Sequence, residues 1–152
     1  LLSERVFMLI GDTYVTGGNF NAALNSYRQA VQLNQTEHRA MNNIAGLLDK
    51  QNTPESLAKA IKVSNQALAL HQEPRYYETR GQVYVKLKRW DEAIEDLERA
   101  LNGRLPNPAP THASLAKAYA AIGQPELANV HRQKSQTAAG ADRSTNQNRR
   151  TD

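Results

Sequence analysis

A pattern of small and large apolar residues recurs four times along this chain at a nearly constant interval. In the first copy, Gly11 precedes Tyr14 by three positions, and Ala23 is followed by Tyr27 and Ala30. The residues equivalent to Tyr14 follow at intervals of 34, 36 and 35 positions, and they are Leu48, Tyr84 and Tyr119. A period of about 34 residues indicates that each copy is one structural unit that stacks on the next.

Each copy contains two segments whose apolar residues recur at the helical interval, so each copy predicts a pair of amphipathic helices. Small residues at Gly11 and Ala23 allow the two helices of the first pair to approach closely. Tyr14 and Tyr27 are expected to fill the space beside them. In the second copy, Thr53 is placed to cap the second helix.

On these motifs the chain resembles the tetratricopeptide-repeat (TPR) family, as a fragment with about four repeats. The resemblance implies an all-α fold, a right-handed superhelical solenoid of antiparallel helix pairs. It implies one TPR domain over residues 1–138, with repeats at about 4–37, 38–73, 74–108 and 109–138. Residues 139–152 are polar and lack large apolar side chains, so we expect a disordered tail there.

The two ends of the repeat array differ. In the fourth copy, Arg132 and Ser135 stand where other copies carry residues suited to a core, so the last helix is expected to face water as a cap. The first copy instead begins with Leu1, Leu2 and Val6 and has no polar cap. We therefore expect either further residues before this segment or self-association through its first helix. The first residue is not Met, so the start is interpreted as truncated and the localisation is left open.

Composition excludes several classes of function. Apolar residues make up 39% of 152 residues, and their runs are far shorter than the roughly 20 residues of a membrane span. The chain has no cysteine, which excludes disulfides and thiolate metal sites. A net charge of +4 is modest and does not by itself indicate a nucleic-acid binder.

No catalytic constellation is recognisable, and we expect no enzyme activity, cofactor or metal site. The histidines lack the spacing of metal ligands, and His112 is interpreted as a residue that packs between helices. The acidic side chains within residues 91–96 are expected to face water. No glycine-rich phosphate loop or nucleophile motif is present.

The resemblance implies that the first helices of the repeats line a concave groove in which partners dock. Arg5, Arg39 and Arg75 share one repeat position and should form a column along this groove. With three lysines added and Asp12, Asp49 and Glu78 subtracted, the predicted face carries a charge of +3. The predicted partner-binding residues are Arg5, Met8, Asp12, Arg39, Asn42, Asn43, Lys50, Arg75, Glu78, Gln82, Lys86 and Lys117.

Chaperone-binding members of the family clamp a C-terminal carboxylate with lysine, arginine and asparagine side chains at defined positions. In this chain those positions hold Met8, Asp12, Asn43, Arg75 and Thr79. Asn43 and Arg75 alone fit, and Asp12 would repel the carboxylate. The sequence therefore argues against that clamp.

The leading hypothesis is a non-catalytic scaffold or adaptor that binds a peptide or helix in the groove. Because arginine binds carboxylates in a bidentate manner, an acidic partner is expected. A nucleic-acid binder that uses the same Arg/Lys column is a weaker alternative, because Tyr14, Tyr84 and Tyr119 are assigned to packing rather than to base stacking. A further alternative is the assembly or regulatory arm of a larger enzyme that lies upstream.

Overall fold

A computed structural model describes residues 2–148 and the side chains of residues 2–140. Over this range the chain forms eight α-helices and no strand, which confirms the all-α expectation. None of the described helices is long and apolar enough to cross a membrane. The helices are α1 (Glu4–Thr16), α2 (Phe20–Leu33), α3 (His38–Gln51), α4 (Pro54–Leu70), α5 (Pro74–Lys86), α6 (Trp90–Asn102), α7 (Ala109–Ala121) and α8 (Pro125–Asn148).

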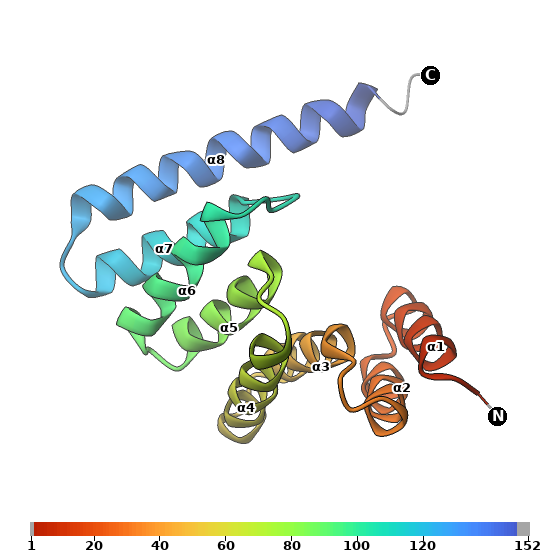
Figure 1. Cartoon of the computed structure of the whole chain (residues 1–152). Coiled ribbons are helices and arrows are strands. Elements are labelled where there is room, and N and C mark those ends of the chain that lie inside the picture. The colour runs from red at the N-terminus through yellow and green to blue at the C-terminus, as the bar shows by residue number, and fades with distance from the viewer. Residues whose placement is uncertain (1, 149–152) are drawn as a thin grey trace.

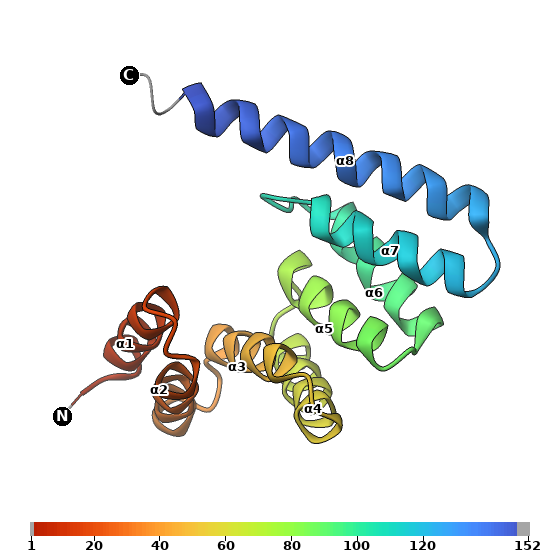
Figure 2. The ribbon, with the colours of Figure 1, turned by 180° about the vertical axis from the view of Figure 1, so that it is seen from behind.

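The helices form four successive pairs, α1–α2, α3–α4, α5–α6 and α7–α8, which together make a solenoid (Figure 1). The second helix of each pair packs against the first helix of the next pair. The first helices α3, α5 and α7 also pack against one another in sequence. This arrangement places α3 and α5 in the middle of the molecule, and the view from behind shows the same order (Figure 2).

In two of these pairs, a glycine in the first helix allows the two helices to approach each other closely. A Cβ atom at Gly11 would lie within 3.0 Å of three atoms of the Tyr27 ring, and Tyr27 is buried. A Cβ at Gly81 would lie 2.8 Å from Cγ of Leu97, which is also buried. The large side chain of the second helix therefore occupies the space that the glycine leaves, as the repeated pattern predicts.

The packing role predicted for Tyr14 is wrong, although it holds for Tyr84 and Tyr119. Tyr84 and Tyr119 are buried, whereas Tyr14 is 40% exposed. The reason is the position of Tyr14 in α1, because α1 packs mainly against α2 among the described helices.

The predicted cap of α4 is confirmed. Thr53 Oγ1 accepts a hydrogen bond from the Ser56 backbone N at 3.0 Å, and Ser56 Oγ accepts one from the Thr53 backbone N at 2.9 Å. This reciprocal arrangement satisfies two backbone donors at the start of the helix.

The last helix differs from the expectation at its end. α8 extends to Asn148, so residues 139–148 are helical where the sequence predicted a disordered tail. No proline follows Pro125, and alanine, which favours helices most strongly, occupies positions 138 and 139. The remaining part of the predicted tail, residues 149–152, lies outside the described residues. Arg132 is exposed, as expected for a cap.

Candidate partner-binding groove

Three hollows adjoin one another along α1, α3 and α5. The first, of about 470 Å³, is lined chiefly by α1, α3 and α5. The second, of about 250 Å³, lies toward Arg39 and Tyr76. The third, of about 340 Å³, lies between α5 and the loop that precedes α7. Arg75 lines all three, while Asp12 and Asn42 line the first two. We refer to these three hollows together as the groove.

The structure brings most of the predicted site residues to the groove. Arg5, Lys86 and Lys117 line none of its hollows, and Lys86 instead forms an ion pair with Asp49 at 2.8 Å. The nine predicted residues that do line it are Met8, Asp12, Arg39, Asn42, Asn43, Lys50, Arg75, Glu78 and Gln82. That these residues bind a partner stays a prediction.

The charge along the groove is more balanced than the sequence suggested. Arg39 and Arg75 line the same hollow, but Arg5 lies outside it, so the predicted column is reduced to two arginines. A hydrogen bond to Glu37 at 3.2 Å raises the pKa of Arg39 and keeps it charged. The charged residues that line the groove are the bases Arg39, Lys50 and Arg75 and the acids Asp12, Asp49, Glu73 and Glu78. The predicted excess of +3 is therefore absent from these hollows.

Asn42 lies where the first two hollows meet. Its residue surface is 4% exposed, and its side-chain oxygen has no hydrogen-bond partner among the described residues. Buried polar atoms in folded proteins are nearly always hydrogen-bonded. The side-chain oxygen of Asn42 is thus an unsatisfied acceptor beside two hollows of the groove.

Tyr27 of α2 lines the first hollow beside Asp12 of α1. Its hydroxyl donates a hydrogen bond to Asp12 Oδ1 at 2.7 Å, and burial raises the pKa of Tyr27 above its ordinary value. The phenol therefore stays protonated and remains a donor to Asp12. This contact links α2 to α1 and holds a carboxylate at the edge of the groove.

Two segments of the chain, residues 4–37 and 74–102, match the family description "Tetratricopeptide repeat". The chain is a tetratricopeptide-repeat protein. The two matched segments correspond to the first helix pair and to the third. No curated protein sequence matches the chain.

Solved structures share the fold of this TPR protein. A crystal structure of MamA has a TM-score of 0.77 and 22% identity, over 93% of this chain and 81% of MamA. The first TPR domain of Spaghetti (RPAP3), bound to the HSP90 peptide SRMEEVD, has a TM-score of 0.72 and 24% identity, over 79% of this chain and 93% of that domain. The Cut9–Hcn1 hetero-tetramer of APC/C has a TM-score of 0.80 and 22% identity, over 91% of this chain and 27% of that chain. At these identities the likeness shows the fold alone.

Several groove residues of the TPR protein were missed by reading the first helices alone. Glu73 immediately precedes α5, Tyr76 lies in its first turn, and Leu105 lies in the loop between α6 and α7. Tyr27 belongs to α2 but reaches the groove through the space beside Gly11. The pairing of a glycine with a large residue in the next helix is the signal that could have identified Tyr27.

One acidic residue contradicts the expectation of a solvated face. Asp96 is 3% exposed and receives two hydrogen bonds from Arg80, at 2.7 Å and 2.8 Å. The bond to Asp96 raises the pKa of Arg80. Asp96 is buried because it faces α5 next to Gly81, whose missing side chain leaves room for it. Asp91 and Glu95 of the same stretch are exposed, as predicted.

His112 packs between helices, as the sequence predicted. Its Nδ1 lies 2.9 Å from Nδ1 of His131 in α8. Both rings are partly buried, and burial lowers the pKa of each. Two neutral rings can share one hydrogen bond at this distance, with one nitrogen as donor and the other as acceptor.

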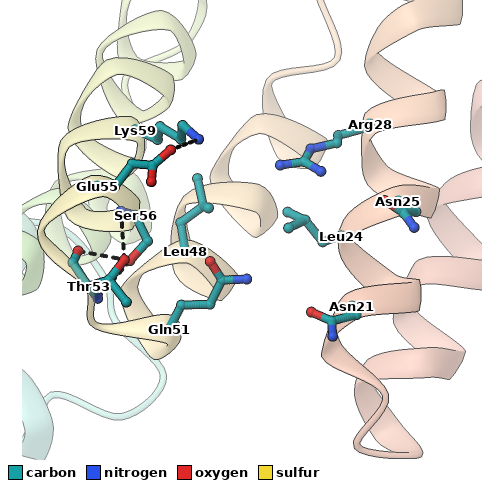
Figure 3. Close-up of a pocket in the computed structure, with 10 residues that line it drawn as sticks. All are labelled: Asn21, Leu24, Asn25, Arg28, Leu48, Gln51, Thr53, Glu55, Ser56 and Lys59. Atoms are coloured by element: carbon teal, nitrogen blue, oxygen red, sulfur yellow. Dashed lines mark hydrogen bonds and ion pairs between the residues drawn. The ribbon is translucent and has the colours of Figure 1, made fainter.

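A separate hollow of about 380 Å³ lies outside the groove, between α2 and α4 (Figure 3). Leu24 and Leu48 face each other across it, and Arg28 reaches toward the gap from α2. Its rim is polar and includes Asn21 and Gln51. No sequence pattern indicates this hollow, because its residues come from three helices and share no repeat position.

Proposed function

We propose that this TPR protein is a scaffold that binds a segment of another protein in the groove along α1, α3 and α5. The observation that carries the proposal is Asn42, whose buried side-chain oxygen has no hydrogen-bond partner among the described residues and which lies between two hollows of the groove. A carboxamide can both donate and accept hydrogen bonds. A backbone N–H group of a bound peptide would supply the donor that the Asn42 oxygen lacks.

Arg75 is placed to bind a carboxylate of the bound segment. It lines all three hollows and has no ion pair among the described residues, unlike Arg39 and Lys86. A guanidinium binds a carboxylate through two parallel hydrogen bonds. We therefore propose that an acidic side chain or a chain terminus of the partner lies against Arg75.

The acids along the groove limit how acidic the partner can be. Asp12 and Glu73 share a hollow with Arg75, and Glu78 shares another. A segment with one carboxylate at Arg75 and neutral or basic residues beside it suits this distribution. The same acids are the reason that we propose a protein segment rather than a nucleic acid, whose phosphates require an excess of basic residues.

The RPAP3 domain, which shares this fold, holds an HSP90 peptide. Its likeness supports a peptide as the kind of partner but not that peptide in particular. Asp12 and Met8 occupy the positions where chaperone-binding members carry groups that hold a carboxylate. We therefore propose a different peptide class for this groove.

The test is selection from a phage-displayed library of random peptides with the 152-residue chain as bait. Selected peptides are then measured by fluorescence anisotropy against the wild type, Arg75→Glu and the control Arg28→Glu. Arg28 is exposed and lines the hollow between α2 and α4, so it supplies the same charge change outside the groove. We expect Arg75→Glu to weaken binding by about tenfold or more, since hydrogen bonds to charged groups contribute about 1.5–3 kcal/mol.

Arg28→Glu should leave the affinity unchanged. If no peptide is selected, the proposal is wrong. If the selected peptides respond to Arg28→Glu and not to Arg75→Glu, the binding site is the hollow of Figure 3 instead of the groove.

A further inference from the structure

Apolar side chains on α1 face away from the rest of the molecule. Val6 and Leu9 are 37% and 67% exposed, and Leu2, just before the helix, is 54% exposed. α1 lies at one end of the solenoid and packs mainly against α2 (Figure 1). By contrast, α3 packs against α2, α4 and α5. Within the part of the chain that the structure describes, the outer face of α1 therefore lacks the cover that the later first helices have.

The spacing of this face matches the seam of a two-helix coiled coil. Within α1, Val6, Leu9 and Thr13 are separated by three and four residues, which is the alternation of core positions in a heptad repeat. Leu2 lies two residues before the helix begins and is exposed. Arg5 and Asp12 are seven residues apart, so both occupy the same flanking position beside the seam. They carry opposite charges.

Opposite charges at one flanking position are complementary when two identical helices run antiparallel. Val6 of one helix then lies across from Leu9 of the other, and Arg5 of each helix lies beside Asp12 of its partner. A parallel pair would instead bring Arg5 near Ile10, which has no charge to offer. The sequence of α1 is thus self-complementary under a two-fold axis.

We propose that α1 pairs antiparallel with α1 of a second copy of this chain. The apolar face made of Leu2, Val6 and Leu9 becomes buried, and two reciprocal Arg5–Asp12 ion pairs flank it. Arg5 has no ion pair among the described residues and lies outside the groove, so it is available for this contact. Asp12 accepts the Tyr27 hydroxyl through Oδ1, which leaves Oδ2 for the arginine of the second copy.

The apolar contact lies outside the groove, because Val6 and Leu9 line none of its hollows, whereas Asp12 lines two of them. The buried area of two short helices is small compared with the roughly 1,200–2,000 Å² of stable interfaces. We therefore expect a weak dimer that dissociates on dilution.

Sedimentation velocity of the 152-residue chain between about 10 µM and about 1 mM covers the range in which such a dimer would form. We expect Leu9→Lys to reduce association at least tenfold, because lysine at a seam position faces an apolar residue of the other copy. The matched control is Leu33→Lys, which places the same charge at the exposed end of α2. A wild-type chain that stays monomeric at the highest concentration overturns the proposal, as does a dimer that Leu9→Lys leaves intact.

A charge exchange tests the antiparallel register. Arg5→Asp and Asp12→Arg, each checked for native helix content by circular dichroism, should associate more weakly alone, because each places like charges together. In a mixture of the two variants, one chain is acidic at both flanking positions and the other is basic at both. Each flanking contact of the heterodimer then joins opposite charges, so heterodimers should form at the wild-type level. If the mixture associates no better than either variant alone, the antiparallel register is wrong.

Discussion

The first and third helix pairs have the same packing but different polar links beside it. In both pairs a glycine of the first helix, Gly11 or Gly81, makes room for a large residue of the second helix. Beside Gly11, the Tyr27 hydroxyl donates to Asp12, which is exposed. Beside Gly81, Arg80 binds the buried carboxylate of Asp96. The two helices thus approach closely in both pairs, but the polar contact between them is a hydrogen bond from a neutral hydroxyl in the first pair and an ion pair in the third.

The other two pairs extend the comparison. α7 and α8 are linked by the imidazoles of His112 and His131. No side-chain hydrogen bond joins α3 to α4 among the described residues, and the buried hydroxyl of Ser64 in α4 has no partner. The comparison teaches that the repeated small and large residues position the helices, whereas the polar link varies from pair to pair. The decrease in the free energy of unfolding when a polar link is removed should therefore depend on the burial and charge of that link.

The largest effect is expected for the buried ion pair. Asp96→Ala leaves Arg80 half-buried without its carboxylate, although Asn65 still accepts one hydrogen bond from it at 2.7 Å. Removing one partner of a buried ion pair lowers the free energy of unfolding by about 3–5 kcal/mol. Urea unfolding followed by circular dichroism measures this. Asp12→Ala is the matched variant in the first pair and should lower the free energy of unfolding by a smaller amount, about 1.5–3 kcal/mol. Equal losses would contradict the assigned difference between the two links.

The next effect concerns the glycines. Gly11→Ala places a methyl group against the Tyr27 ring, and such overpacking lowers the free energy of unfolding by about 1–3 kcal/mol. In a Tyr27→Ala background the same change should have little effect, because the ring is gone, so the two substitutions should not be additive. Gly46 is the control, because a Cβ there meets nothing within 4 Å. Gly46→Ala within α3 should stabilise the protein by up to about 1 kcal/mol. Additive losses for Gly11→Ala and Tyr27→Ala would argue against the close contact.

The contacts in the first and third pairs show how much of this structure can be predicted from the sequence. Gly11 and Tyr27 recur at fixed repeat offsets, so the helix pairs and the first helices that line the groove follow from the period. Arg80 and Asp96 share no offset with the other repeats, and an acid in a charged stretch is expected at the surface, so their burial depends on one tertiary contact. The positive charge along the groove was overestimated because it also depends on tertiary contacts. Lys86 forms an ion pair with Asp49, and Glu73, just before α5, lines the groove.

A smaller effect, which depends on pH, is expected for the link in the fourth pair. Burial lowers the pKa of His112 and His131, so the folded state binds protons less readily than the unfolded chain. Their contribution to stability is fully present above the ordinary pKa of about 6.5 and decreases as the pH falls below it. Among neighbouring charges, Lys134 lowers both pKa values, and Glu98 of α6 raises that of His131. The expected result is a lower midpoint of urea unfolding at pH 5.5 than at pH 7.5, both about one unit from the ordinary value.

His131→Gln serves as the comparison for this pH dependence. Glutamine keeps a hydrogen-bonding side chain but does not titrate, so the shift between the two pH values should be smaller than in the wild type. Carboxylates elsewhere in the chain contribute equally to both proteins and cancel in the difference. A variant with the same shift as the wild type would show that the imidazole pair is not the titrating group.

The smallest effect is expected in the second pair, where no side-chain hydrogen bond joins the two helices as the structure describes them. Ser64→Ala removes a buried hydroxyl that has no partner, so no hydrogen bond is lost. Alanine also favours a helix slightly more than serine, and the free energy of unfolding should stay equal or rise by up to about 1 kcal/mol. Ser26→Ala is the control, because the Ser26 hydroxyl donates to the Ala22 carbonyl at 3.0 Å and its loss removes a real contact. If Ser64→Ala destabilises the protein more than Ser26→Ala does, the Ser64 hydroxyl has a partner in solution, and the second pair has a polar link like the others.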